Sequence, residues 1–359
     1  MNHKRARSKE CLYAIEQVPV LQNRLFDTAA EARNCVRGNV ELGVDPATGI
    51  VTNVAFDPSR VRYDRHYNNE QSLSPAFVRH LDKVAFLIRR HLGDRGLYEI
   101  GCGKGSFLER LAGYGCEVGG CDPTYEGDNS AVTRAFFSAE VGIQKRQLIL
   151  RHVLEHVADP VAFLRMLADV NGGGSIYIEV PCLDWIIDHS AWFDIFYEHV
   201  NYFRADDFRR IFGRVQTFRL FGGQYLAIIG DLATLRDPAA IRAQAGRESP
   251  PTFPPTFGPP ATAAAEPYDV VWGSASKGVI YALMRERLGY PVTAAVDVHP
   301  AKQKRHLPAT GVPTLSPAML LDRLPRGGRV IVMNSNYLPE IRAVTGDRYR
   351  YDVIDRVPA

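Results

Sequence analysis

The stretch Leu97-Tyr98-Glu99-Ile100-Gly101-Cys102-Gly103-Lys104-Gly105 decides the fold of this chain. An apolar run predicts a strand at 97–100 and a helix follows at about 105–114, so the alternate glycines lie between a strand and a helix. Glycine lets the backbone come close to a ligand at the carboxyl end of a parallel sheet. A dinucleotide site would favour G-x-G-x-x-G, whereas this turn reads G-x-G-x-G with Glu99 two places ahead of it. The stretch therefore predicts a ligand-binding turn that differs from the dinucleotide pattern.

The next predicted strand, at 117–121, ends in an acidic residue, Asp122. A carboxylate at this position can accept hydrogen bonds from both hydroxyls of a ribose. A glycine turn and a later acid are each common, but their combination in a β-α-β context indicates a cofactor site.

The alternation of strands and helices continues outward from this turn. Strands are predicted at 97–100, 117–121, 133–137, 147–151 and 175–180, with a further helix at about 160–168. Such alternation predicts βαβ units and a parallel sheet, which is an α/β fold. Beyond a proline-rich stretch the pattern repeats, with strands at 270–272, 292–296 and 330–333 and a helix at 277–288. Four parts are expected: a small leading domain at 1–65, the core at 66–235, a Pro/Ala-rich linker at 236–267, and a second, smaller Rossmann-like α/β domain at 268–359.

Composition narrows the possible partners. The 359 residues include 43 Lys plus Arg against 40 Asp plus Glu, a net charge of +3. No large positive field is present to attract a phosphate backbone, so no nucleic-acid partner is expected. No apolar stretch reaches 18 residues, and the six cysteines form no disulfide-like pattern. The sequence thus predicts a cytoplasmic monomer or homodimer without membrane association.

The glycine turn with its flanking acids closely resembles the cofactor site of class I methyltransferases. That resemblance implies S-adenosylmethionine as the cofactor, with a class I methyltransferase Rossmann-like sheet. Aromatic residues of the stretch 134–138 fall where the adenine would lie, although an ordinary buried strand end explains each of them equally well. The expected cofactor-binding residues are Glu99, Gly101, Cys102, Gly103, Gly105, Asp122, Pro123, Phe137, Arg151, His152 and Tyr67.

The stretch 151–160 resembles the motif that follows the fourth strand in the same superfamily, a leucine-glutamate-histidine run before a helix. In that motif His156 lies at the methyl end of the cofactor. His152 and His156 also have the spacing of a zinc-binding helix, but Glu155 directly precedes His156 and Asp159-Pro160 ends the segment. No metal ligands are therefore expected here.

The stretch 192–203 resembles the F-D-x-F-Y-E-H-x-x-Y-F signature of nucleotide-sugar C-methyltransferases. Matches at 179–181 and 222–223, in the leading segment and in the closing domain extend this resemblance over nearly the whole chain. An isolated Tyr197 and His199 would instead be buried polar groups of the core. The family carries a zinc site of paired cysteines in its leading domain, whereas only Cys11 and Cys35 precede residue 102 here. Two thiolates cannot form a four-ligand site, so no zinc is expected.

The resemblance implies carbon methylation of a nucleotide-linked keto-deoxysugar through a base-generated enolate. His199 is the expected base, Tyr197 and Glu198 would orient it or the substrate, and His156 would lie on the enolate side. Tyr63 and Tyr67 would close over the cofactor or substrate. One alternative keeps the fold and cofactor but places the methyl group on an oxygen, nitrogen or carbon of another small metabolite. Another is a non-catalytic binding protein, against which the intact glycine turn and Asp122 argue.

Overall fold

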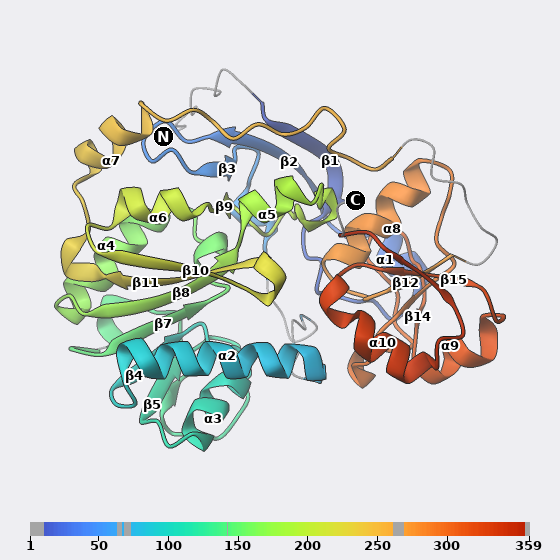
Figure 1. Cartoon of the computed structure of the whole chain (residues 1–359), viewed down its shortest axis with the longest axis horizontal. Coiled ribbons are helices and arrows are strands. Elements are labelled where there is room, and N and C mark those ends of the chain that lie inside the picture. The colour runs from blue at the N-terminus through green and yellow to red at the C-terminus, as the bar shows by residue number, and fades with distance from the viewer. Residues whose placement is uncertain (1–10, 63–66, 68–72, 142, 261–268, 356–359) are drawn as a thin grey trace.

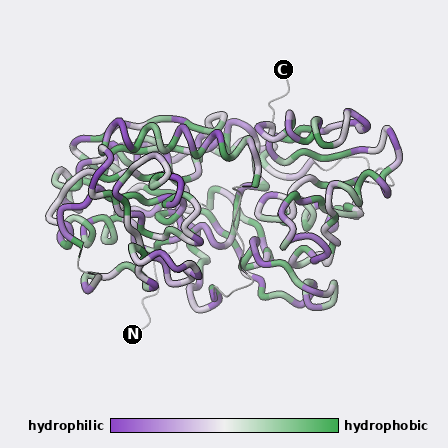
Figure 2. Tube along the Cα trace, turned by 90° about the horizontal axis from the view of Figure 1, so that it is seen from below, coloured by the Kyte–Doolittle hydropathy of each residue, from purple (hydrophilic) through white to green (hydrophobic). Residues whose placement is uncertain are grey.

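The computed structural model describes residues 11–62, 67, 73–141, 143–260 and 269–355, which form three sheets (Figure 1). Hydrophobic and hydrophilic positions alternate along the trace (Figure 2). Helix α2 (Pro75–Leu92) is an example, because it buries Phe77, Leu81, Val84 and Ile88 at helical spacing. Within the described residues no helix is long and apolar enough to cross a membrane.

The leading sheet is antiparallel and draws its last strand from the core. Its order is β1 (Tyr13–Pro19), β2 (Arg37–Val44), β3 (Val51–Asn53) and β9 (Asn201–Tyr202). The short helix α1 (Ala29–Arg33) precedes β2. Because β9 follows directly on the segment 192–200, the leading sheet fixes the position of that segment.

The central sheet has seven strands in the order β10-β11-β8-β7-β4-β5-β6. Five are parallel: β4 (Leu97–Ile100), β5 (Val118–Cys121), β6 (Val132–Thr133), β7 (Gln147–Arg151) and β8 (Ser175–Pro181). The antiparallel strands are β11 (Tyr225–Asp231) and β10 (Val215–Leu220). Besides α2, the helices of this part are α3 (Ser106–Gly113), α4 (Pro160–Asn171), α5 (Leu183–Asp188) and α6 (Ala205–Ile211). The predicted α/β fold with a Rossmann-like methyltransferase sheet is confirmed.

The third sheet is parallel, with the order β14-β13-β12-β15-β16. Its strands are β12 (Val270–Trp272), β13 (Ala294–Val296), β14 (Thr314–Leu315), β15 (Arg329–Val332) and β16 (Arg350–Val353). Helices α8 (Lys277–Arg287), α9 (Pro317–Arg323) and α10 (Leu338–Thr345) accompany it. The chain order reverses between β12 and β15, and open parallel sheets bind ligands at such a point.

The strand predicted at 133–137 was wrong beyond its first residue. Pairing with β5 ends at Thr133, and the amide of Ala135 turns back to donate to the carbonyl of Thr133 (3.0 Å). Within the described residues β6 is the edge strand and has no second neighbour to extend its pairing. Consequently Phe136 is 74% exposed, and Phe137 packs only partly against the core.

The stretch 236–267, expected to be a linker, contains structure of its own. It begins with the helix α7 (Pro238–Ala245). Farther on, Phe253 and Phe257 pack on Tyr13 of β1, with ring centroids 6.0 and 5.0 Å from that ring. Residues 253–257 therefore lie against the leading sheet (Figure 1).

Candidate active site

The glycine turn after β4 has a backbone that favours glycine at each of its three alternate positions. Gly101, Gly103 and Gly105 have φ values of 74°, 55° and 82°. A Cβ on Gly101 would meet Val153 at 2.5 Å, whereas one on Gly103 would have no atom within 4 Å. The turn is thus closed toward the protein at Gly101 and open at Gly103, where a ligand could approach the backbone.

Two acidic residues flank this turn. Asp122, at the end of β5, accepts a hydrogen bond from the amide of Gly103 (2.9 Å), and its other oxygen accepts from Thr124. Glu99 is buried, and its Oε2 has no partner within the described part of the chain. Burial raises the pKa of Glu99 to about 7, and the charge of Arg151 opposes that rise. A buried oxygen without a partner beside an open glycine turn fits a ligand that donates a hydrogen bond there.

The other expected cofactor residues occupy different environments. Pro123 is exposed beside Asp122, and Cys102 is buried, which raises the pKa of its thiol. Arg151 points into the protein instead of toward the turn: it pairs with Glu179 at 3.5 Å and its guanidinium lies 4.3 Å from the ring centre of Phe107. The expectation of a direct cofactor contact by the Arg151 side chain does not fit this geometry.

Glu179 of β8 is the centre of a buried charged network. Its carboxylate accepts a hydrogen bond from Tyr177 (2.7 Å) and contacts the ring nitrogens of His80 (2.9 Å) and His152 (3.2 Å). Burial opposes ionisation of Glu179, but Arg151 and the two histidines hold its pKa well below the usual range. Glu179 is therefore ionised, and its negative charge is balanced by Arg151 and His152.

His152 is held between two carboxylates. Its Nδ1 lies 3.1 Å from Glu155 and its Nε2 lies 3.2 Å from Glu179. Although burial lowers the pKa of His152, these hydrogen bonds raise it to about 9. Both ring nitrogens are therefore occupied as donors, and His152 lines the site as a fixed positive charge.

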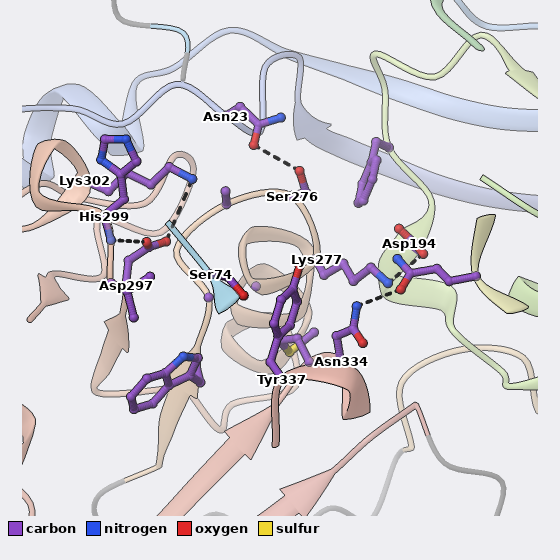
Figure 3. A pocket seen from close by; sticks show the side chains of 18 of the residues that line it. Asn23, Ser74, Asp194, Ser276, Lys277, Asp297, His299, Lys302, Asn334 and Tyr337 are labelled. Atoms are coloured by element: carbon purple, nitrogen blue, oxygen red, sulfur yellow. Dashed lines mark hydrogen bonds and ion pairs between the residues drawn. The ribbon is translucent and has the colours of Figure 1, made fainter. Parts of the chain in front are cut away.

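A cavity that is partly open to solvent lies where the core, the leading segment and the third sheet meet. It contains five of the residues expected from the sequence: Tyr67, His152, His156, Glu198 and His199. Its opposite wall comes from the carboxyl ends of β12, β13 and β15 and from the start of α8 (Figure 3). The glycine turn and Asp122 do not line it.

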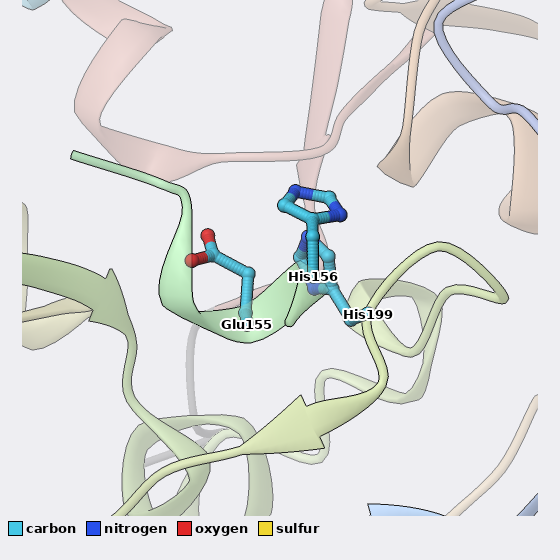
Figure 4. Close-up of side chains that lie close together, drawn as sticks. All are labelled: Glu155, His156 and His199. Carbon is cyan, nitrogen blue, oxygen red and sulfur yellow. The ribbon is translucent and has the colours of Figure 1, made fainter. Parts of the chain in front are cut away.

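His156 and His199 face each other although 42 residues separate them. The amide of Val200 donates to the carbonyl of Glu155 (2.8 Å), and the side chain of Asn201 donates to the carbonyl of Val157 (2.6 Å). These bonds hold the segment before β9 against the turn after β7. The two imidazole rings consequently lie 5.0 Å apart, centre to centre (Figure 4).

The two rings have different hydrogen bonds. Nδ1 of His156 lies 2.9 Å from the carbonyl of Glu198, so it carries the hydrogen in this contact. Nδ1 of His199 is buried without a partner among the described residues. Burial, reinforced by the charge of His152, holds the pKa of His199 well below its usual range. His199 is thus a neutral imidazole beside the cavity.

Glu198 and Tyr197 mainly tie the leading segment to the core. The carboxylate of Glu198 accepts from the amide of Gln22 (2.9 Å) and from the hydroxyl of Tyr67 (2.9 Å). The hydroxyl of Tyr197 instead accepts from the amide of Asp57 (2.9 Å), away from the cavity. Tyr197 is therefore a buried polar group of the core, as the simpler interpretation of the sequence had it, and the expected catalytic role does not fit its position.

Tyr67, an expected cofactor residue, lines the cavity, and its hydroxyl donates a hydrogen bond to Glu198. Tyr63, expected to close over the site, lies outside the described residues.

The sequence did not single out several polar residues of the cavity wall. Lys277 pairs with Asp194 at 2.9 Å, and the amide side chain of Asn334 donates to Gln224 (2.7 Å), each joining the third sheet to the core. Glu155, between the two expected histidines, is 1% exposed and its Oε2 has no partner among the described residues. One feature of the sequence could have indicated these residues. Each lies just beyond the carboxyl end of a parallel strand or in a segment packed against that end.

One family model matches part of the chain. Residues 74–216 match a family model described as a methyltransferase domain. No curated protein matches the chain.

Solved structures resemble less than half of this chain. A SAM-dependent methyltransferase from Archaeoglobus fulgidus is 21% identical, with 42% of this chain and 94% of that chain covered and a TM-score of 0.33. Magnesium protoporphyrin IX methyltransferase from Synechocystis PCC 6803 with bound SAH is 17% identical, with 45% of this chain and 84% of that chain covered and a TM-score of 0.34. The 1,6-didemethyltoxoflavin-N1-methyltransferase from Burkholderia thailandensis is 13% identical, with 44% of this chain and 79% of that chain covered and a TM-score of 0.32.

The family match covers the glycine turn, Asp122 and His156, which follow strands β4, β5 and β7 of one parallel sheet, and also His199, which packs against His156. The chain therefore carries a class I SAM-dependent methyltransferase domain over residues 74–216.

Proposed function

We propose that the enzyme methylates a carbon atom of a small keto compound, a nucleotide-linked keto-deoxysugar, through an enolate made in the cavity. The observation that supports this most directly is His199, a half-buried imidazole that faces His156 beside the cavity and whose buried Nδ1 has no partner among the described residues. Carbon methylation needs a base, because a carbon next to a carbonyl becomes a nucleophile only after it loses a proton.

The cofactor side of the proposal rests on the turn after β4. The open backbone at Gly103 would accommodate the cofactor, Asp122 would accept from its ribose hydroxyls, and Glu99 would accept from a donor of its amino-acid part. S-adenosylmethionine, when bound, supplies a methyl group already activated by the positive sulfonium. The protein's own task is then to align the acceptor and exclude water.

On the acceptor side, His199 removes the proton next to the carbonyl and holds it on its ring. The new negative charge forms on the carbonyl oxygen, on the side where His156 and the positive His152 line the cavity. Glu198 acts one step away, because its main-chain carbonyl fixes the His156 ring and its carboxylate holds Tyr67. We therefore assign Glu198 a positioning role.

A second candidate is methylation of an oxygen, nitrogen or carbon of another small metabolite. Cys11 is exposed, Cys35 is partly buried, and both are free thiols, so the paired-cysteine zinc site of sugar C-methyltransferases has no counterpart in them. The lack of this cysteine pairing distinguishes the chain from sugar C-methyltransferases in the leading domain, and therefore concerns the identity of the acceptor. It does not involve the residues of the cofactor site.

Exchange of acceptor hydrogen for solvent deuterium tests the base without requiring turnover. Incubation of a thymidine-diphosphate keto-deoxysugar with the full chain and S-adenosylhomocysteine is expected to exchange the hydrogen next to the carbonyl. His199→Ala should abolish exchange and keep S-adenosylhomocysteine binding, while His91→Ala on α2 should change neither. Exchange that persists in His199→Ala would remove His199 as the base. Cofactor binding without any exchange or methylation of the keto sugar would favour the second candidate.

A further inference from the structure

Three side chains beside the cavity offer ligand atoms at mutually short distances. Glu155 and His156 come from the turn after β7, and His199 comes from the segment before β9 (Figure 4). One ligand atom from each lies within 4.8 Å of the other two. The sequence had considered only the spacing of His152 and His156, and the fold replaces His152 in that set with His199.

The surroundings prepare each histidine for this role. Nδ1 of His156 is fixed on the carbonyl of Glu198 (2.9 Å), which leaves Nε2 with a free lone pair. Histidine ligands of metals usually donate their second ring nitrogen in this way, because the bond fixes the tautomer and the ring orientation. His199 brings a ring whose buried Nδ1 has no partner in the described part of the chain.

Glu155 adds a carboxylate of which only one oxygen has a partner among the described residues. Its Oε1 lies 3.1 Å from His152, while its Oε2 is buried and unpartnered among the described residues. Since the residue is 1% exposed, water does not compensate that oxygen as it would at the surface. A cation held by the two imidazoles would satisfy this buried carboxylate oxygen.

We propose that Glu155, His156 and His199 bind a divalent transition-metal ion of the zinc type. Two imidazoles and one carboxylate suit zinc or cobalt, whereas magnesium and calcium prefer oxygen ligands throughout. Ligand atoms on a tetrahedral zinc lie roughly 3.4 Å apart, so the side chains close by small rotations around the ion. Three protein ligands leave a fourth position for water or another ligand.

Metal binding at this site is expected to inhibit methyl transfer. This expectation, unlike metal binding itself, rests on the proposed function. An ion bound to His199 occupies the lone pair with which the ring would take a proton. Zinc in excess is therefore expected to stop methyl transfer and to be reversed by a chelator. Metal binding itself requires neither the cofactor nor the acceptor.

Cobalt(II), whose visible absorption is intense when it is tetrahedral, is the probe. Titrated into the metal-free full chain, it should saturate at one equivalent and be displaced by zinc. Glu155→Gln and His199→Ala should each weaken cobalt affinity by about tenfold or more, and His91→Ala should leave it unchanged. Binding of S-adenosylhomocysteine to each variant shows that the fold survives.

The absence of saturable cobalt absorption in the wild type would overturn the proposal. The same holds if both variants bind cobalt as the wild type does. Cobalt binding without zinc inhibition would keep the metal site and remove the base, so failures of the two proposals can be told apart.

Discussion

Glu179 shows how much of this site depends on a residue that never reaches the cavity. It is fully buried and contacts His80, His152 and Tyr177, so it orients the imidazolium that lines the wall. A buried carboxylate with these partners is replaced only at a high cost, because each partner then loses its counter-charge or acceptor.

Glu179→Gln should lower the free energy of unfolding by about 3–5 kcal/mol, since it removes the negative charge that balances Arg151 and His152. Tyr177→Phe is the matched control, because it removes one hydrogen bond and no charge and should cost about 1 kcal/mol. Urea denaturation measures both. Equal losses in the two variants would contradict the central role of the carboxylate.

Tyr197→Phe tests the corrected position of that tyrosine. Loss of its hydrogen bond to Asp57 should lower the free energy of unfolding by about 1 kcal/mol. Cofactor affinity and methyl transfer should stay as in the wild type, because the hydroxyl faces away from the cavity. A large fall in turnover at unchanged stability would restore Tyr197 to the catalytic set.

At the scale of elements, a glycine in the turn between β4 and α3 can be compared with a glycine elsewhere that has a similar backbone conformation. The comparison distinguishes backbone strain from contact with a ligand. Gly103 and Gly115 both have positive φ values, 55° and 82°, and a Cβ on either would have no atom within 4 Å. They differ in that Gly103 donates its amide to Asp122 in the proposed cofactor site.

Gly103→Ala and Gly115→Ala should therefore cost similar stability, on the order of 1 kcal/mol each. Only Gly103→Ala should weaken S-adenosylhomocysteine binding, by about tenfold or more, because the new methyl group enters the space kept for the ligand. Thermal unfolding and calorimetric titration measure the two effects. Equal affinities in both variants would place the cofactor elsewhere.

Local pattern predicted the strands that the sheet buries on both sides. The predicted ranges 97–100 and 147–151 coincide with β4 and β7, because short, mostly apolar runs are typical of strands buried on both faces of a parallel sheet. The same reasoning failed at 134–137, where the chain leaves the sheet edge and Phe136 turns to solvent. Edge pairing depends on neighbours that the local sequence does not reveal.

The site was predictable only in part for a related reason. His156 and His199 each carried a recognisable motif, but their contact depends on β9 joining the leading sheet and on Val200 bonding to Glu155. The roles of Glu198 and Tyr197 likewise depend on the strand ends and loops of the leading domain that they contact. Long-range contacts of this kind follow from topology, which local periodicity does not specify.

At the scale of the whole molecule, the cavity exists because the third sheet is fastened to the core. Lys277 pairs with Asp194 at 2.9 Å with 13% and 4% of their side chains exposed, and Glu340 of α10 accepts from Ser74 and from the amide of Ala76 at the start of α2. These contacts hold the two walls of the cavity together.

Lys277→Ala should lower the free energy of unfolding by about 3 kcal/mol, because it leaves Asp194 buried without its counter-charge. Arg209→Ala is the control: its pair with Asp206 on α6 is more than half exposed and should contribute less than about 1 kcal/mol. Chemical denaturation compares them. A negligible effect of Lys277→Ala would mean that the pair does not fasten the third sheet.

Calorimetric titration of the full chain with S-adenosylhomocysteine tests the central claim most directly. We predict one binding site per chain in the wild type, weakened about tenfold or more in Asp122→Asn, where a neutral amide replaces the acceptor of the ribose hydroxyls. Absence of binding to the wild type, or equal binding by Asp122→Asn, would contradict the assignment of the cofactor to the turn after β4.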